Sequence, residues 1–229
     1  MKDRIDLEDV ALLGRTFKEY CTYFQLKDDD LAAGRVLDMA AGPGSFCAEA
    51  TAHGYHVTAA DPIYGSTPEA IAEKSRSDLD EVMRQLPEVM HKYNWTFYSD
   101  PSELGRHRER ARRIFLEDYS RDHKRYIRTA LPKTPFEDKE FSLVLVSHFL
   151  FLYDDWFDYD FHKASVLELA RIAQREIRIY PLINMRAIRS SYVERLMHDP
   201  ACSALTFERV KSDFEFFKNA DQLLVIRTE

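Results

Sequence analysis

The sequence predicts a doubly wound α/β fold whose central sheet is mostly parallel. The apolar run Val36–Met39 ends in a glycine turn at residues 42–44, and a helix-like stretch opens directly after this turn. A second strand-like run, His56–Ala60, ends at Asp61. The near-continuous apolar run Phe141–Val146 is typical of a central parallel strand that is covered on both faces.

Helices and one long insertion account for the rest of the first half of the chain. In Leu7–Leu26, apolar residues recur at three- and four-residue steps, which predicts an amphipathic helix. A second helix, Ser45–His53, connects the first two strands. The stretch after Asp61 is too long for an ordinary connection, and it contains two helix-like segments, Pro68–Met90 and about Pro101–Tyr119.

The second half of the chain alternates strand-like and helix-like segments, which indicates further βαβ units. After the third strand, at Tyr126–Ala130, and the strand Phe141–Val146, the predicted elements are a helix at Phe161–Ala173, a strand at Glu176–Tyr180, a helix at Arg189–His198, and final strands at Leu205–Val210 and Leu223–Arg227.

The glycine turn and Asp61 together describe a site for a nucleoside. Gly42 and Gly44 are two of only seven glycines, and glycine lets a ligand approach the backbone closely. The turn between strand and helix directs unpaired backbone N–H groups beyond the strand ends. An acid at the end of the second strand, about 20 residues on, is placed to accept hydrogen bonds from ribose hydroxyls.

The residues of the turn distinguish between two ligand classes. A dinucleotide fingerprint needs a third glycine at position 47, which is Cys47. The run Asp38-Met39-Ala40-Ala41-Gly42-Pro43-Gly44 instead resembles the first motif of class I S-adenosylmethionine (SAM)-dependent methyltransferases. It departs from that motif at Ala40, where the family more often has glycine. A carboxylate at Asp38 would repel a pyrophosphate but suits the ammonium group of a methionine moiety.

The resemblance covers about Leu7 to Arg227 and implies a more detailed architecture. The family fold is a seven-stranded sheet that ends in an antiparallel hairpin, beneath which Phe214, Phe216 and Phe217 are expected to pack. We expect a single domain at residues 1–229, with an N-terminal helical segment at 1–34. From its helical pattern, we expect the insertion at 66–125, between the second and third strands, to be a helical lid over the cleft, with a purely structural helical hairpin as the alternative. The stretch His148–Tyr153 is also similar to one in uncharacterised bacterial small-molecule methyltransferases.

The same resemblance implies a set of cofactor-binding residues. Asp61 would bind the ribose, Ile63 would lie on the adenine with Pro62 fixing the turn, and Arg15 would pair with a carboxylate of cofactor or substrate or lie in solvent. No acid occurs at residues 129–131, so backbone groups would recognise the adenine. The full set expected to bind SAM is Arg15, Tyr20, Asp38, Ala40, Gly42, Pro43, Gly44, Asp61, Pro62, Ile63, Ala130, Leu131, Ser147, His148 and Phe149.

His148 is the candidate catalytic base, because an imidazole titrates near neutrality and this one follows a buried strand. A base is needed if the acceptor is a hydroxyl or a protonated amine. Tyr153 and Asp154 are weaker candidates, and a cofactor-orienting or purely structural His148 stays an alternative. The stretch lacks the Asn/Asp-Pro-Pro-Tyr/Phe tetrad of DNA adenine and glutamine N-methyltransferases, which disfavours those substrates.

Composition limits the partners. A net charge of −7 and a pI near 5.7 disfavour general nucleic-acid and anionic-membrane binding. The start MKDRIDLEDV has no apolar signal core, so we expect a cytoplasmic protein. As for its oligomeric state, we expect a monomer or a homodimer. The three cysteines form no metal pattern, and no metal is expected. The arginines of the second insertion helix indicate either a solvated, salt-bridged face or a groove for an anionic substrate.

Three functions follow from these patterns. The favoured one is a SAM-dependent methyltransferase that acts on an O or N atom of a small molecule and releases S-adenosylhomocysteine. The second is a SAM-binding module without turnover. The third is a nucleotide-dependent oxidoreductase, which Cys47 and the terminal hairpin disfavour.

Overall fold

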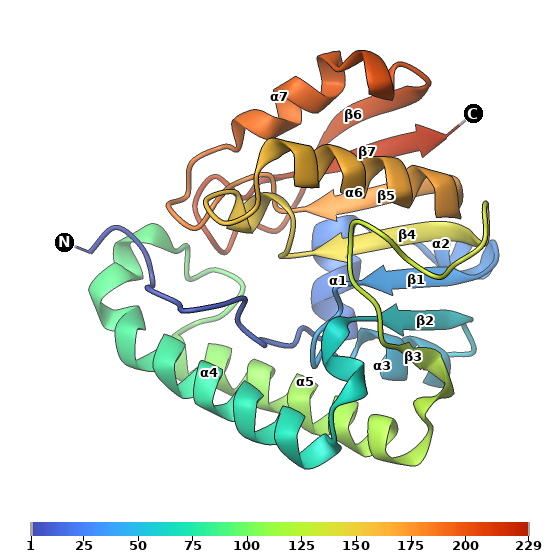
Figure 1. Ribbon diagram of the computed structural model, residues 1–229. Helices are drawn as coiled ribbons and strands as arrows, with labels where there is room; N and C mark the ends of the chain where they lie inside the picture. The colour runs from blue at the N-terminus through green and yellow to red at the C-terminus, as the bar shows by residue number, and fades with distance from the viewer. Residues whose placement is uncertain (1, 229) are drawn as a thin grey trace.

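A seven-stranded sheet forms the centre of the computed structural model, which describes residues 2–228 (Figure 1). Its strand order is β3-β2-β1-β4-β5-β7-β6, and only β7 runs antiparallel to its neighbours β5 and β6. The strands are β1 (Val36–Met39), β2 (Val57–Ala60), β3 (Tyr126–Ile127), β4 (Phe141–Ser147), β5 (Ala173–Tyr180), β6 (Leu205–Lys211) and β7 (Gln222–Thr228). The predicted fold class, a mostly parallel sheet with a terminal antiparallel hairpin, is confirmed.

Helices cover both faces of this sheet. They are α1 (Phe17–Phe24), α2 (Asp28–Ala32), α3 (Phe46–Ala52), α4 (Pro68–Val89), α5 (Pro101–Arg121), α6 (Tyr159–Ile172) and α7 (Ser191–His198). In β4, Leu143 and Leu145 join the core shared with α1, α3, α4 and α5, whereas Val144 and Val146 join the core shared with α6 and α7. Because successive strand residues face opposite sides, two apolar cores require an uninterrupted apolar strand. None of the helices within residues 2–228 is long and apolar enough to cross a membrane.

The predicted N-terminal helix at Leu7–Leu26 is wrong over its first half. Helix α1 begins only at Phe17, where Thr16 and Glu19 form a capping box. Residues 2–15, here called the N-terminal segment, instead run alongside α4 before reaching α1 (Figure 1). Polar groups of α4 hold the segment: Asp78 accepts a hydrogen bond from the Leu12 N–H (2.9 Å), and Gln85 bonds the backbone of Asp6. The segment therefore lies along α4 instead of extending α1 toward the N-terminus.

The insertion between β2 and β3 is a pair of long helices, α4 and α5, close to the predicted ranges. Both begin at a proline behind a capping side chain, Thr67 for α4 and Asp100 for α5. The third strand is shorter than predicted and ends at Ile127, because the backbone beyond it turns, with Ala130 bridging to Lys133.

The connection between α4 and α5 packs against the β6–β7 loop. Tyr93 lies 4.8 Å from Phe216 and 4.9 Å from Phe217, measured between ring centroids, and Tyr98 lies 4.7 Å from Phe216. The Asn94 N–H also donates to the Phe216 carbonyl at 2.7 Å. The expectation that the phenylalanines of this loop pack beneath the terminal hairpin is therefore corrected, since they dock the insertion onto the rest of the domain.

Candidate functional site

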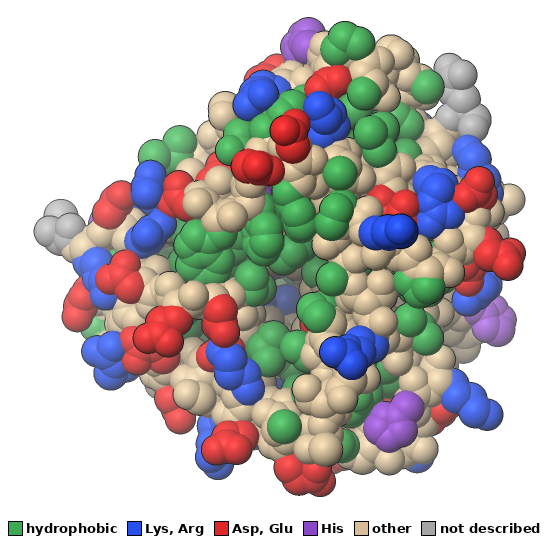
Figure 2. Space-filling view, viewed as in Figure 1, with side chains coloured by type: hydrophobic (Ala, Val, Ile, Leu, Met, Phe, Trp, Pro, Cys, Tyr) green, Lys and Arg blue, Asp and Glu red, His purple; other side chains and the backbone are tan. Residues whose placement is uncertain are grey.

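A cavity of about 610 Å³ opens at the C-terminal ends of the central strands. Its floor includes Met39 from β1, Ser147 from β4 and Tyr180 from β5, and its roof comes from the N-terminal segment and α4. Figure 2 shows the hollow near the middle of this face, bordered mainly by hydrophobic side chains. The volume is in the range of pockets for small molecules and cofactors.

Most of the residues predicted from the sequence border this cavity. They are Arg15, Tyr20, Ala40, Gly42, Asp61, Pro62, Ile63, Ala130, Leu131, Ser147, His148 and Phe149. They come from loops that are far apart in the chain but follow the ends of adjacent parallel strands, as expected for an open α/β sheet. Asp38, Pro43 and Gly44 are not among the residues that line it.

Asp61 links the two strand ends on which a nucleoside would rest. Its Oδ2 accepts a hydrogen bond from the Gly42 N–H (2.9 Å), and its Oδ1 accepts one from the Ile63 N–H (3.0 Å). Burial raises the pKa of Asp61 to about 6, against the opposing effect of these two N–H donors. A carboxylate has about four acceptor positions, so Asp61 keeps capacity for two further donors at the cavity wall.

The backbone around the glycine turn adopts the left-handed conformation at two positions, Ala40 with φ 58° and Gly42 with φ 54°. Ala40 thus occupies a conformation that favours glycine, the residue more usual at this position of the motif it resembles. The loop forms nevertheless, and the methyl group of Ala40 borders the cavity.

The N-terminal segment covers the outer part of this turn. A Cβ on Gly14 would lie 2.2 Å from the Pro43 carbonyl oxygen, so the two chains touch through their backbones. The Ser45 N–H at the start of α3 donates to the Arg15 carbonyl at 2.9 Å. Gly14 and Arg15, which we predicted to be helical, therefore separate Pro43 and Gly44 from the cavity.

Asp38 lies behind Tyr20. The Tyr20 hydroxyl donates to Asp38 Oδ1 at 2.9 Å, while Oδ2 has no hydrogen-bond partner among the described residues. Burial raises the pKa of Asp38 to about 8, although the bond from Tyr20 acts in the opposite direction. Any contact between Asp38 and a ligand would run through the Tyr20 hydroxyl, which itself lines the cavity.

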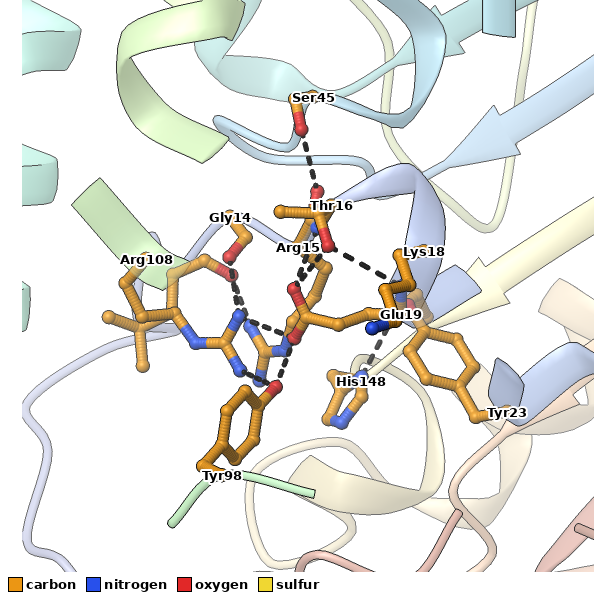
Figure 3. A network of polar contacts seen from close by, with 12 residues as sticks. Gly14, Arg15, Thr16, Lys18, Glu19, Tyr23, Ser45, Tyr98, Arg108 and His148 are labelled. Carbon is orange, nitrogen blue, oxygen red and sulfur yellow. Dashed lines mark hydrogen bonds and ion pairs between the residues drawn. The ribbon is translucent and has the colours of Figure 1, made fainter. Parts of the chain in front are cut away.

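A buried charged network adjoins the cavity (Figure 3). Arg108 Nη1 donates to Glu19 Oε1 at 2.6 Å and to the Gly14 carbonyl at 3.1 Å, and its Nη2 donates to the Tyr98 hydroxyl at 2.8 Å. Burial by itself would raise the pKa of Glu19, but the guanidinium groups of Arg108 and Arg15 and the bond from Tyr98 lower it to about 2. Glu19 is thus ionised. Through Arg108, which bonds both Glu19 and the Gly14 carbonyl, the network joins α1, α5 and the N-terminal segment.

Arg15 lines the cavity beside this network without a carboxylate of its own. Within residues 2–228 it forms no ion pair, and its side chain donates to one protein acceptor, the Leu13 carbonyl. Burial and the neighbouring Arg108 charge lower the pKa of Arg15, which Glu19 partly offsets. The Glu19 carboxylate thus forms its ion pair with Arg108, and its charge acts on Arg15 only at longer range.

His148 occupies the C-terminal end of β4, where its φ of 52° is unusual for a non-glycine residue. Its backbone N–H donates to the Tyr180 carbonyl at 2.6 Å, which fixes this conformation. Nδ1 lies 2.9 Å from Ser147 Oγ, which lies 2.7 Å from the Tyr23 hydroxyl. Burial first, and then the charges of Arg15 and Arg108, hold the pKa of His148 well below its usual range, so the imidazole is neutral at pH 7.

The sequence reasoning did not single out Glu19, Tyr98 or Arg108 as site residues. Glu19 resembles an ordinary capping-box residue, and Arg108 belongs to a run of charged residues. The helical register of α5 indicates that Arg108 is buried, because it shares a face with the apolar residues Leu104, Ala111 and Phe115 at three- and four-residue steps.

The remaining candidates are placed as follows. Tyr153 lines the cavity and its hydroxyl accepts the Ala11 N–H (3.2 Å), whereas Asp154 is not among the residues that line it. Apart from Arg108, the basic face of α5 is mostly paired on the surface, as in the bonds from Arg112 to Glu109 and from Arg113 to Glu117. Across the part of the chain that the structure describes, no group of three or more His, Cys, Asp or Glu side chains is arranged to hold a metal ion.

Comparisons with known proteins find a sequence relative that spans nearly the whole chain. No family model matches the chain. The uncharacterized protein MJ0045 of Methanocaldococcus jannaschii is 41% identical over 224 residues, which span 97% of this chain and 98% of that protein.

Similar solved structures are more distant. The PH0226 protein from Pyrococcus horikoshii is 15% identical, covering 86% of this chain and 82% of its own, with a TM-score of 0.48. Magnesium protoporphyrin IX methyltransferase from Synechocystis, with bound SAM, is 12% identical (85% and 69% covered, TM-score 0.45). A TehB-like SAM-dependent methyltransferase from Corynebacterium glutamicum is 13% identical (86% and 80%, TM-score 0.44).

Proposed function

We propose that this chain, which belongs to the same family as the uncharacterized protein MJ0045 of Methanocaldococcus jannaschii, is a SAM-dependent methyltransferase that acts on an O or N atom of a small molecule. The observation that carries the proposal is the Asp61 carboxylate, fixed by the N–H groups of Gly42 and Ile63 at the wall of a cavity above the strand ends. The β5-β7-β6 arrangement supports it, since this hairpin distinguishes the methyltransferase sheet from dinucleotide-binding sheets.

The lining of the cavity fits SAM. Asp61 has acceptor positions left for the two ribose hydroxyls, and Ile63 and Leu131 offer apolar surface for the adenine. The Tyr20 hydroxyl, whose proton goes to Asp38, offers an acceptor for the ammonium group of the methionine end, at the side of the cavity nearest α1. S-adenosylhomocysteine would be the product, and no metal is part of this proposal.

SAM supplies an electrophilic methyl group, so the protein has mainly to position the acceptor and exclude water. Positioning alone is worth roughly 7–11 kcal/mol in favourable cases. The apolar wall of the cavity excludes water, and His148, at the end of β4, is the polar side chain best placed to contact the acceptor. Its neutral imidazole acts either as a base or as a hydrogen-bond donor, depending on which nitrogen carries the proton.

We further propose that the insertion at residues 66–125 acts as a lid, together with the N-terminal segment. Both line the cavity. The N-terminal segment is joined to α4 near the surface by polar contacts such as the ion pair of Lys74 with Asp9 (3.1 Å). Exposed ion pairs contribute little stability, so we expect this segment to separate from α4 more readily than α4 and α5 separate from the rest of the domain. The net charge of −7 supports a small-molecule substrate over nucleic acid or an anionic membrane.

Two measurements test the proposal. Calorimetry with SAM and with NAD separates a methyltransferase from a nucleotide-dependent oxidoreductase, and we expect binding of SAM alone. Transfer of labelled methyl from SAM into a metabolite extract separates an enzyme from a binding module without turnover. Binding of SAM without any labelled product would leave only the binding module.

A further inference from the structure

We propose that the methyl acceptor is a carboxylic acid with an apolar body, bound through its carboxylate by Arg15 and His148 and methylated on that carboxylate. The inference rests on the proposed methyl transfer and adds the class of substrate. Three features of the cavity support it. Arg15 is a cation without an ion-pair partner, His148 offers a hydrogen-bond donor where we expected a base, and the remaining wall is apolar.

The cation is Arg15. All the other charged groups that line the cavity have partners: Arg108 bonds Glu19, Lys74 bonds Asp9 and Asp78, and Asp61 bonds two backbone N–H groups. Glu19 pairs with Arg108 and acts on Arg15 only at longer range, and Arg15 donates only to the Leu13 carbonyl among the described residues. Since a guanidinium has five donors and a buried charge without a partner is costly, an anionic ligand is the natural complement.

The donor is His148, as the chain of hydroxyls next to it indicates. The Tyr23 side chain is fully buried, and Ser147 Oγ is its one hydrogen-bond partner in residues 2–228. If Ser147 donated to Tyr23, the buried phenol proton would be left without an acceptor, which is unfavourable. Tyr23 therefore donates to Ser147, and Ser147 donates to Nδ1 of His148. A neutral imidazole that accepts at Nδ1 carries its proton on Nε2.

This tautomer changes the role expected of His148. With the proton on Nε2, the ring presents an N–H donor and not the lone pair that a base needs. Next to it stands the Arg15 guanidinium, a second set of donors (Figure 3). Two donors and no base suit an oxygen that is already ionised, such as a carboxylate, and not a hydroxyl or an ammonium group.

The rest of the cavity is apolar and would hold the body of the acid. Helix α4 contributes one wall, the N-terminal segment the roof, and the chain after β4 the opposite wall. The apolar side chains concerned are Ile5, Leu7, Val10, Leu13, Ile71, Leu79, Val82, Met83, Leu86, Phe149, Leu152, Phe157 and Phe161. Burying such a body provides affinity, while Arg15 and His148 orient the carboxylate.

The chemical step needs no proton transfer. A carboxylate oxygen attacks the methyl carbon of SAM, the new C–O bond forms as the C–S bond breaks, and the bonding pair returns to sulfur. The negative carboxylate and the positive sulfonium become a neutral methyl ester and a neutral thioether. A neutral His148 that donates and does not titrate is consistent with this balance.

Binding of a probe acid tests the carboxylate receptor. We expect 1-naphthoate to bind the protein saturated with S-adenosylhomocysteine roughly 10- to 100-fold more tightly than 1-naphthalenemethanol, by calorimetry. Arg15→Gln should abolish this difference, and the matched control Arg113→Gln, on the exposed face of α5, should preserve it. Equal binding of acid and alcohol, or loss of S-adenosylhomocysteine affinity alone in Arg15→Gln, would overturn the proposal, the latter because Arg15 would then serve the cofactor.

The product identifies the acceptor atom independently. Label transferred from SAM into a metabolite extract should be released as volatile methanol by alkali, because methyl esters hydrolyse and methyl ethers and amines do not. Base-stable label overturns the carboxylate acceptor but leaves methyl transfer intact, whereas no label overturns methyl transfer itself.

Two variants of His148 separate donor from base. His148→Gln, which keeps an N–H donor, should retain turnover within about 10-fold, and His148→Leu should lose more. Melting temperatures of both variants show whether they fold. Equal loss in two folded variants would restore the role of base.

Discussion

Arg108 Nη1 and Glu19 Oε1 lie 2.6 Å apart in a fully desolvated ion pair that joins the insertion helix α5 to α1. Tyr98, from the connection between α4 and α5, bonds both partners (Figure 3). The pair therefore fixes one end of the insertion against the helix that precedes the first strand. It also explains why α5 carries a buried arginine between the buried apolar residues Leu104 and Ala111.

Breaking this pair should destabilise the protein strongly. In Arg108→Met the ionised Glu19 loses its main partner, and removal of one member of a buried pair costs about 3–5 kcal/mol. Arg113→Met removes an exposed arginine of the same helix and should change stability little. The free energy of unfolding in urea measures both. A loss in Arg108→Met no larger than in Arg113→Met would contradict the structural role of the pair.

Glu19 should also give the protein an acid-sensitive step. Its pKa is about 2 in the folded protein, below the ordinary value of 4.5. The stabilisation is therefore fully present above pH 4.5 and is lost as the pH falls toward 2. Urea unfolding between pH 5 and pH 2 should show a steeper loss for the wild type than for Glu19→Gln, which has no carboxylate to protonate. Parallel curves would show that Glu19 is not the group responsible.

Asp38 should act in the opposite direction. Its pKa is about 8 in the folded protein against 3.8 ordinarily, because the side chain is buried. Asp38 then favours the folded state below pH 3.8, and this contribution is lost as the pH rises toward 8, with a slope of at most about 1.4 kcal/mol per pH unit. Asp38→Asn cannot ionise and keeps an oxygen for Tyr20, so its stability relative to the wild type should increase from pH 4 to pH 8.

Asp61 should control the affinity for SAM. Losing its charge-assisted hydrogen bonds in Asp61→Ala should weaken binding by roughly 10- to 100-fold. Because the pKa of Asp61 is about 6 and the ionised form is the better acceptor, wild-type affinity should also fall as the pH drops below 6. Calorimetry between pH 5 and pH 8 measures both effects. Unchanged affinity in a folded variant would remove Asp61 from the ribose site.

Ala40→Gly tests the strain in the turn. With φ at 58°, an alanine costs about 1–2 kcal/mol that glycine avoids, although glycine has more freedom in the unfolded chain. We expect a net stabilisation of up to about 1 kcal/mol. The neighbouring Ala41 has no positive φ, so Ala41→Gly should instead destabilise by about 0.5–1 kcal/mol. The melting temperatures of the two variants measure these effects, and a lower melting temperature for Ala40→Gly than for the wild type would contradict backbone strain at Ala40.

Ligand binding should slow hydrogen exchange in the proposed lid. With S-adenosylhomocysteine present, α4 and the N-terminal segment should exchange more slowly, because both line the cavity. Helices α6 and α7, which pack on the other face of the sheet, serve as the internal control. Equal exchange with and without ligand in α4 would leave the insertion a fixed structural hairpin.

The sequence by itself determined the sheet and its ligand edge. Apolar runs such as Phe141–Val146, the glycines at 42 and 44, and Asp61 are local signals, because strand burial and turn conformation depend on neighbours along the chain. Parallel strands bring their C-terminal ends to one edge, so the residues after each strand converged on the cavity as expected.

Only the tertiary structure decided which of these residues face a ligand and in which chemical state. The N-terminal segment follows α4 because its backbone groups form hydrogen bonds with Asp78 and Gln85 of that helix. The spacing of apolar residues in the segment does not reveal hydrogen-bond partners so far away in the chain. Its course closes off Pro43 and Gly44 and brings Arg15 into the cavity. The proton position on His148 depends on Tyr23, which is 125 positions away in the chain by number. Burial and long-range hydrogen bonds set charge and tautomer, and both arise only when the chain has packed.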